Sequence, residues 1–195
     1  TEGHCVAVAP PGSGKTEVLT TRLAWDLLHH VPEPRGAACV TLTVAAAEQL
    51  RTRVEGLHSF RRPNVFIGTV HSFLLNEIVI PFAPLAGRDD LTTITIVGQS
   101  QAEAMLNSIV YDVYGPTADI WNIPSTVQIS RRRMATDEQW ARHDARMKII
   151  ADRYVTQLHA EGLIDFTELV ALAIDLTEQF DLVRRTLTAK YPRLY

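Results

Sequence analysis

The stretch AVAPPGSGKTEV, residues 7–18, decides the fold of this chain. It continues an apolar run at residues 4–9 that we expect to form a short buried strand. A Pro-Pro pair then ends the strand, a Gly-Ser-Gly segment turns the chain, and Lys-Thr begins a helix. A strand, a glycine turn and a helix start, in that order, form the context in which a Gly-Lys-Thr string binds a nucleotide phosphate.

This loop is expected to hold the phosphates with main-chain amides, with the Lys15 amine and with the Thr16 hydroxyl. Glycines let N–H groups turn inward, and the helix N-terminus adds unpaired donors and partial positive charge. Lys15 places a charge at the β- and γ-phosphates, and Thr16 offers a ligand to Mg²⁺. The predicted ligands are therefore ATP and Mg²⁺. The residues predicted to bind them are Pro11, Gly12, Ser13, Gly14, Lys15 and Thr16, with Lys15 and Thr16 as catalytic residues and Thr16 as metal ligand.

The first position of the usual phosphate-loop string is Ala9 here instead of glycine. Alanine after a buried strand is a mild steric change. The alternative interpretation is a glycine turn that caps a helix and binds nothing. The position of the string between a strand and a helix favours the phosphate site.

Bulk composition is typical of a globular protein of one or two domains. The chain has 195 residues, of which 46% are hydrophobic and 21% charged, and its net charge is −3. This charge argues against a protein held on DNA by bulk electrostatics alone, although a local basic track remains compatible with it. The absence of a long apolar run and of a signal-peptide pattern predicts a cytoplasmic protein with no membrane partner. Cys5 and Cys39 are expected to be buried, reduced thiols in strands.

Strands and helices alternate in the first part of the chain. Periodicity predicts helices at residues 15–30, 45–57 and 70–80, and apolar β-branched runs predict strands at 37–43 and 64–68. This alternation is typical of βαβ units and a parallel sheet. The fold class is therefore α/β, with a parallel sheet flanked by helices and a P-loop at the start of the first helix.

The alternation is lost between residues 85 and 160, where an inserted all-helical subdomain is expected. Helices are predicted at 99–113 and, capped by Asp137, at 138–161, with a loop or turn at 121–124. The α/β pattern returns at 164–166, followed by helices near 167–176 and 181–189 and a strand entry at 191–195. Residues 1–84 and 161–195 would then belong to the α/β domain that carries the phosphate loop.

Three further strings carry a resemblance to a known family. They are TLTVAAAEQLRTRV (41–54), IGTVHSF (67–73) and GLIDFTELVALA (162–173). In this order and spacing the chain resembles the UvrD/Rep/PcrA family of superfamily 1 DNA helicases over nearly its whole length. The resemblance implies the N-terminal part of an ATP-driven 3′-to-5′ helicase and translocase on single-stranded DNA. It also implies a P-loop NTPase (RecA-like) fold, with residues 1–84 and 161–195 as an incomplete ATP-binding domain 1A and residues 85–160 as an inserted helical subdomain 1B.

The resemblance also implies partners and contact residues. The partners are single-stranded or partly duplex DNA and the second RecA-like domain of the same helicase. The expected DNA-binding residues are Thr43, Thr69, His71, Ser72 and Arg132. The chain begins after the family's adenine-reading glutamine motif and stops before its DExx motif, so the isolated chain is expected to bind nucleotide weakly and not to hydrolyse it.

Several readings stay open from the sequence. The family usually has an aromatic residue and Thr-Asn-Lys where this chain has Leu-Thr-Val-Ala at 42–45, which favours a degenerate, non-catalytic scaffold as one alternative. A second alternative is another P-loop phosphotransferase. Arg131, Arg132 and Arg133 either contact DNA phosphates or form a solvated charge run. Asp165 and Glu168 are interpreted as capping and packing residues rather than a catalytic carboxylate pair.

Overall fold

The computed structural model describes residues 4–57, 64–89, 91, 94–115 and 121–195. The chain divides into two compact units, Thr1–Phe73 with Asp181–Tyr195, and Leu74–Phe180. The boundaries between the two units therefore fall after residues 73 and 180. The sequence instead predicts that the helical insertion covers residues 85–160. The assignment of residues 85–160 to a 1B-like subdomain stays a prediction.

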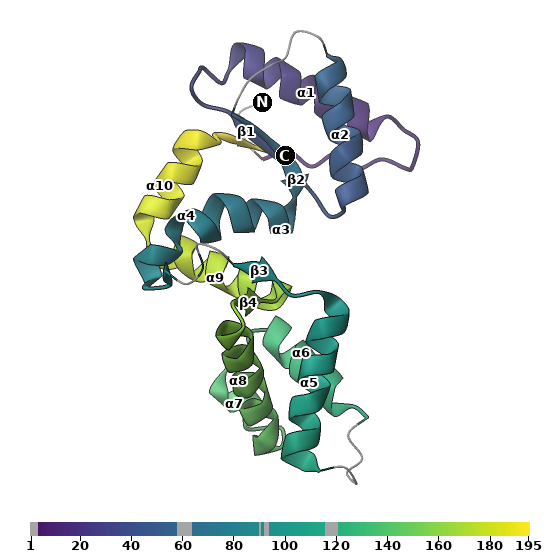
Figure 1. Ribbon diagram of the computed structural model, residues 1–195. Coiled ribbons are helices and arrows are strands. Elements are labelled where there is room, and N and C mark those ends of the chain that lie inside the picture. The colour runs from purple at the N-terminus through teal and green to yellow at the C-terminus, as the bar shows by residue number, and fades with distance from the viewer. Residues whose placement is uncertain (1–3, 58–63, 90, 92–93, 116–120) are drawn as a thin grey trace. The chain divides into compact units, whose positions relative to one another are not determined.

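The first unit is built on a parallel three-stranded sheet (Figure 1). Its strands are β1 (Ala37–Thr41), β2 (Val65–Thr69) and β5 (Arg193–Leu194), in the order β2-β1-β5. Ala37 is opposite Val65 on one side and Arg193 on the other. The predicted parallel sheet and the strand at the end of the chain are confirmed.

Helices α1 (Lys15–His29) and α2 (Val44–Gly56) pack with this sheet. Short α3 (Val70–Phe73) continues from β2, and α10 (Asp181–Lys190) leads into β5. The core joins Leu23 and Leu27 of α1 to Leu50 of α2 and Cys39 of β1, all of them almost fully buried. Burying a leucine side chain contributes roughly 1.5–3 kcal/mol, so this cluster fixes α1 and α2 on the strands.

The strand predicted for residues 4–9 is wrong. These residues form no regular structure, and the side chains of Val6 and Val8 are 85% and 91% exposed. A strand needs a neighbour for its backbone hydrogen bonds, and residues 4–9 pair with none of the three strands of this sheet. Cys5 is consequently exposed, which corrects the prediction of a buried thiol, whereas Cys39 is buried as expected.

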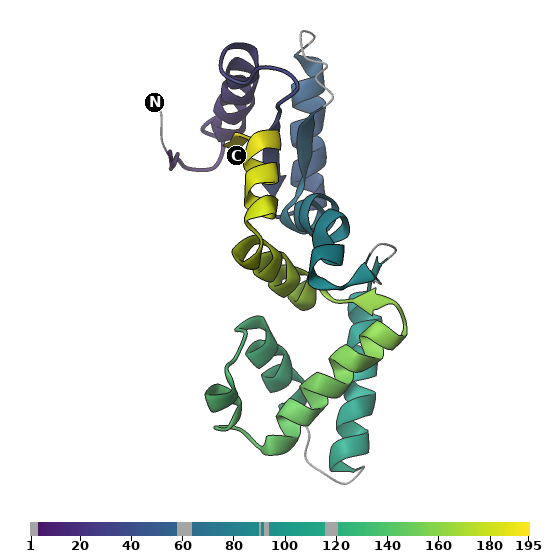
Figure 2. The same ribbon diagram turned by 90° about the vertical axis from the view of Figure 1, so that its left-hand side faces the viewer.

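The second unit is mostly helical. Its helices are a π-helix η1 (Leu74–Val79), α4 (Ile80–Phe82), a 3-10 helix η2 (Ala83–Ala86), α5 (Gln99–Tyr114), α6 (Ile123–Arg132), α7 (Asp137–Trp140), α8 (Ala145–Ala160) and α9 (Phe166–Gln179). Strands β3 (Thr95–Ile96) and β4 (Leu163–Ile164) pair in parallel. Figure 2 shows α5 and α8 side by side, and the buried residues Leu106, Val110, Ile150 and Tyr154 belong to their shared core.

Three predicted elements of this part are corrected. The helix predicted at 138–161 is two helices, because the segment contains two N-capping residues, Thr136 before α7 and Asp144 before α8. The helix predicted at 70–80 changes to π geometry after α3, ahead of Pro81, which has no N–H to donate. The loop or turn predicted at 121–124 is confirmed for residues 121–122, but residues 123–124 already belong to α6, with Pro124 in its first turn.

In the described ranges, no helix has the length and apolar character required to cross a bilayer.

Candidate functional site

The glycine turn before α1 has the backbone geometry of an anion-binding loop. Gly12 and Gly14 have φ angles of +78° and +82°, a region that favours glycine, and Gly14 is the N-cap of α1. The Ser13 amide donates to the Pro10 carbonyl at 3.3 Å, which closes the turn. The space beside both glycines is open. The loop therefore presents its main chain to solvent at the start of a helix.

Lys15 lies folded back over this loop. Its Nζ atom donates to the carbonyl oxygens of Ala9 at 2.5 Å and Pro10 at 2.7 Å. Within the described part of the chain, the N–H groups of Lys15, Thr16 and Glu17 have no acceptor. The first turn of a helix leaves such donors free for an anion, and its dipole adds positive charge. These residues fit a nucleotide phosphate.

Thr43 follows β1 and caps α2. Its hydroxyl accepts the Ala46 N–H at 3.2 Å, while its carbonyl accepts the Thr41 hydroxyl at 2.9 Å. The neighbouring side chains of Leu42 and Val44 are 88% and 75% exposed. The segment predicted to line a DNA path is thus an apolar, solvent-facing turn around a capping threonine.

Thr69 and Ser72 form a second capping arrangement after β2. The Thr69 hydroxyl accepts the Ser72 N–H at 3.1 Å, and the Ser72 hydroxyl donates to the Thr69 carbonyl at 2.8 Å. His71, between them, is half-buried. Because Thr41 is opposite Thr69 in parallel register, the segments carrying Thr43 and His71 leave the same edge of the sheet. The structure brings these four predicted residues to one edge.

Arg131, in the second unit, is paired with Asp165. The two residues form a two-pronged ion pair at 2.5 and 3.2 Å, and their side chains are 8% and 11% exposed. The Arg131 guanidinium also lies over the Tyr154 ring, 4.7 Å from its centroid. Of the arginine run, only Arg132 and Arg133 are exposed, so the reading of Arg131 as a DNA contact or solvated charge is corrected.

The DFTEL string has the structural role predicted for it. The Asp165 carboxylate caps α9 by accepting the Glu168 N–H at 2.9 Å. Glu168 is buried, contacts the His159 ring, and lies 3.7 Å from the Arg88 guanidinium. Asp165 thus uses both of its oxygens, whereas Glu168 makes these contacts through Oε1 and its buried Oε2 has no hydrogen-bond partner among the described residues.

Sequence reasoning missed a buried carboxylate in the first unit. Asp26 is 2% exposed and accepts from Arg22 at 3.0 Å, from the His30 ring at 2.9 Å and from the Tyr195 hydroxyl. Burial alone would raise the pKa of Asp26, but hydrogen bonds from Tyr195, Arg22 and His30 outweigh it and lower that pKa overall. The sequence contained a signal for this burial, because Asp26 lies on the same face of the helix as the buried Leu23 and Leu27.

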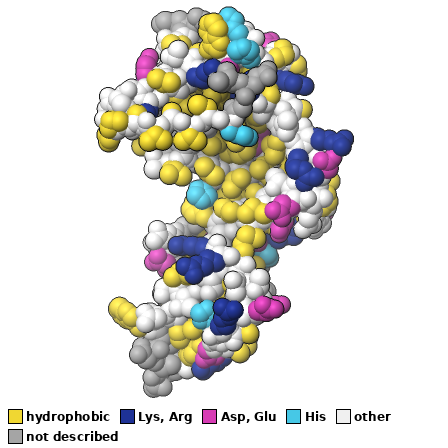
Figure 3. Space-filling model, turned by 180° about the vertical axis from the view of Figure 1, so that it is seen from behind, with side chains coloured by type: hydrophobic (Ala, Val, Ile, Leu, Met, Phe, Trp, Pro, Cys, Tyr) yellow, Lys and Arg dark blue, Asp and Glu magenta, His cyan; other side chains and the backbone are white. Residues whose placement is uncertain are grey.

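The surface charge matches the composition. On the face seen in Figure 3, the basic and acidic side chains of the described residues are interspersed. This distribution agrees with the net charge of −3. On this face, a nucleic-acid contact would depend on individual side chains and loop amides.

Comparison with known proteins places the chain in a family. The model of the UvrD/REP helicase N-terminal domain matches residues 1–195. The chain therefore belongs to the UvrD/REP helicase N-terminal domain family, which confirms the resemblance found in the sequence.

The curated relatives are DNA helicases. The chain is similar to the ATP-dependent DNA helicase SRS2 of Saccharomyces cerevisiae, with 27% identity over 193 residues, covering 84% of this chain and 16% of the relative. It is also similar to the ATP-dependent DNA helicase PcrA of Staphylococcus aureus, with 25% identity over 191 residues, covering 92% of this chain and 25% of the relative. The chain thus spans a quarter or less of the length of these relatives.

Proposed function

We propose that this chain is the ATP-binding portion of an ATP-dependent DNA helicase that translocates 3′ to 5′ on single-stranded DNA. The observation that carries the proposal is the glycine turn at the start of α1, with free amides and Lys15, in a chain of the UvrD/REP family. The RecA-like character of the first unit is part of the same proposal.

In this proposal the loop binds the nucleotide through its own main chain. The amides of residues 12 and 14–16 face the phosphates, and Lys15 exchanges its two carbonyl acceptors for phosphate oxygens. Thr16 holds Mg²⁺ through its hydroxyl. ATP with Mg²⁺ supplies the phosphoanhydride whose hydrolysis drives translocation. Cleavage requires carboxylates that position the attacking water, and we expect these outside the residues of this chain.

The DNA side of the proposal rests on one edge of the sheet. Thr43, Thr69, His71 and Ser72 gather where β1 and β2 end. Their hydroxyls and the half-buried imidazole are donors and acceptors of the kind that contact phosphate and sugar. Arg132, exposed at the end of α6, is proposed as a separate phosphate contact.

The test compares Lys15→Ala and Arg132→Ala in the natural protein that carries this chain. Lys15→Ala should abolish nucleotide binding and leave DNA affinity without nucleotide unchanged. Arg132→Ala should weaken single-stranded DNA binding and make its salt dependence shallower by about one unit of slope. Unchanged nucleotide binding in Lys15→Ala would refute the proposal.

A second candidate function is a non-catalytic, partner-binding module. It is favoured by Leu42 and Val44, which place exposed apolar side chains where the family carries its stacking aromatic ring and its amide side chain. This candidate predicts that the natural protein binds neither single-stranded DNA nor ATP with measurable affinity, so the same experiment separates the two.

A further inference from the structure

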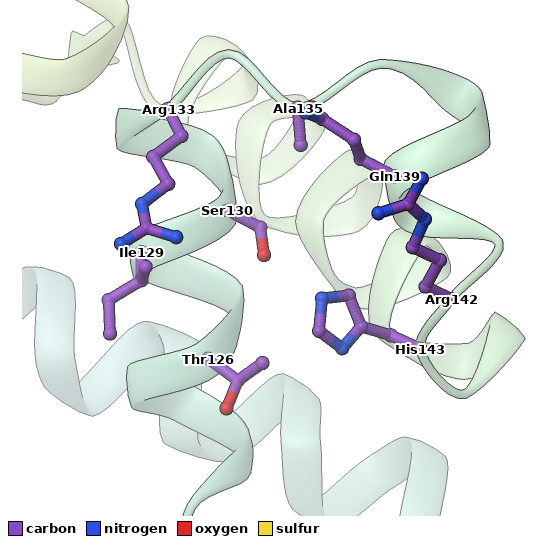
Figure 4. Close-up of a pocket in the computed structure, with 8 residues that line it drawn as sticks. All are labelled: Thr126, Ile129, Ser130, Arg133, Ala135, Gln139, Arg142 and His143. Atoms are coloured by element: carbon purple, nitrogen blue, oxygen red, sulfur yellow. The ribbon is translucent and has the colours of Figure 1, made fainter.

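The second unit contains a polar pocket between α6 and the segment around α7 (Figure 4). Its volume is about 280 Å³, and none of the described residues that line it is acidic. The polar side chains of the lining are Thr126, Ser130, Arg133, Gln139, Arg142 and His143. A pocket of this size accommodates a small anion together with part of the group that carries it.

Two of these side chains have structural partners. The Thr126 hydroxyl donates to the Asn122 carbonyl at 2.8 Å. The Gln139 side chain accepts the Thr136 N–H at 2.9 Å in the capping box of α7, which fixes the turn that follows. That turn presents Arg142 and His143 to the pocket.

The basic side chains of the lining are unneutralised. Arg133, Arg142 and His143 have no side-chain hydrogen bond or ion pair with any residue that the structure describes. By contrast, Arg131 and Arg146, in the same unit, are paired with Asp165 and Asp144. Basic groups left unpaired around one concavity create a positive potential there, which attracts an anion.

Ser130 provides an independent observation. It is 6% exposed, and its hydroxyl points into the pocket in Figure 4. Among the described residues it has no hydrogen-bond partner. Although the residue as a whole is buried, its hydroxyl oxygen is still accessible from the pocket, so it is free to donate to an acceptor bound there.

We propose that this pocket binds one phosphate group. Ser130 donates to a phosphate oxygen from the buried wall, and Arg133 and Arg142 bind the remaining oxygens through their planar forks. The His143 ring offers a further N–H donor. A tetrahedral phosphate matches this set better than a carboxylate does, because its oxygens point in more directions than the two of a carboxylate. The source is either a DNA backbone phosphate or free phosphate.

The test follows the imidazole NMR signal of His143 in the natural protein that carries this chain. The signal is assigned by its loss in His143→Asn. Inorganic phosphate, and separately a short duplex DNA without ATP, are titrated at constant ionic strength. A saturable shift of this signal is expected with at least one of them, and the local readout separates the pocket from the glycine turn near Lys15.

Matched variants test the pocket itself. Removing a charge-assisted contact in Arg142→Gln should weaken binding about tenfold, and Ser130→Ala should also weaken it. Arg153→Gln removes the same charge from an exposed position on α8 that does not line the pocket, and should leave binding unchanged. Unmoved signals of the other histidines show that each variant is folded.

Each outcome either supports the phosphate site or overturns it. A shift with duplex DNA assigns the source to a backbone phosphate, and a shift with inorganic phosphate alone assigns it to free phosphate. The proposal is overturned if neither ligand moves the His143 signal. It is equally overturned if acetate moves that signal as strongly as phosphate does, or if Arg153→Gln weakens binding as much as Arg142→Gln.

Discussion

The guanidinium of Arg131 holds both carboxylate oxygens of Asp165, and so ties the last turn of α6 to the first turn of α9. The same carboxylate caps α9 by accepting the Glu168 N–H. One buried acid thus serves an ion pair and a helix cap. This arrangement explains why Asp165, the first residue of the DFTEL string, has a structural role. It also explains why Arg131, the first of the three consecutive arginines, points inward.

Breaking this pair should destabilise the second unit. Arg131→Gln leaves the Asp165 carboxylate buried without its counter-charge, at a cost of about 3–5 kcal/mol. Arg132→Gln changes the next, exposed arginine and should stay within about 0.5 kcal/mol of the wild type. Urea unfolding, followed by a probe in the second unit, measures both. Equal stabilities of the two variants would contradict the structural role of the pair.

Acid should release the Asp26 network. The pKa of Asp26 is lowered in the folded state, so its stabilising contribution is complete above the unfolded pKa of about 3.9 and is lost as the pH falls through the folded pKa. Asp26→Asn should flatten the dependence of the unfolding free energy on pH in this acid range. Tyr195→Phe removes one of the hydrogen bonds that lower the pKa, so the acid loss of stability should be smaller and should be complete at a higher pH. Unfolding free energy measured from neutral to acid pH tests this, and identical acid limbs for all three proteins would be evidence against it.

Gly14 should tolerate no side chain, for a conformational reason. Its φ of +82° disfavours alanine by roughly 1–2 kcal/mol even though the space beside it is open. Gly14→Ala should therefore disturb the start of α1 and weaken nucleotide binding. Gly56→Ala, in the last turn of α2 and also in open space, carries no such strain and should be neutral or slightly stabilising. Calorimetric titration with ATP, together with thermal unfolding, compares the two.

Thr43 should show whether its predicted DNA role is separable from its cap. Thr43→Ala removes the acceptor for the Ala46 N–H and should cost about 1 kcal/mol of stability. Thr43→Ser keeps the hydroxyl and should retain both stability and DNA affinity. If Thr43→Ser restores stability but not single-stranded DNA binding, the methyl group contributes to the contact. Fluorescence anisotropy with labelled oligonucleotide distinguishes these results.

The two cysteines should react at very different rates. Burial raises the pKa of the Cys39 thiol to about 11, so at neutral pH it is protonated as well as inaccessible. Cys5 is exposed. A thiol reagent should modify Cys5 in the native protein and Cys39 only after unfolding, as mass spectrometry of the modified protein would reveal. Rapid native labelling of Cys39 would mean that the β1 core opens readily.

Local sequence signals predicted much of the fold and of the phosphate loop. Leucines at helical spacing predicted α1, and short β-branched runs predicted β1 and β2, because these periods depend only on neighbouring residues. The glycines and Lys15 were predicted as a loop at a helix start, and the structure has that geometry. The strand at 4–9 failed because strand formation depends on an available sheet edge, which an apolar run cannot specify.

The sequence by itself determined the class of fold and the family, and it predicted the residues that bind a nucleotide. Motifs and periodicity depend only on residues that are close together in the chain. Only the tertiary structure decided the pairing of Arg131 with Asp165, the burial of Asp26 beside Tyr195, and the pocket around Ser130. Those relationships join residues that are distant in the chain or lie on different elements. Whether a charge is buried and paired, or left free for a ligand, follows from packing that no local pattern encodes.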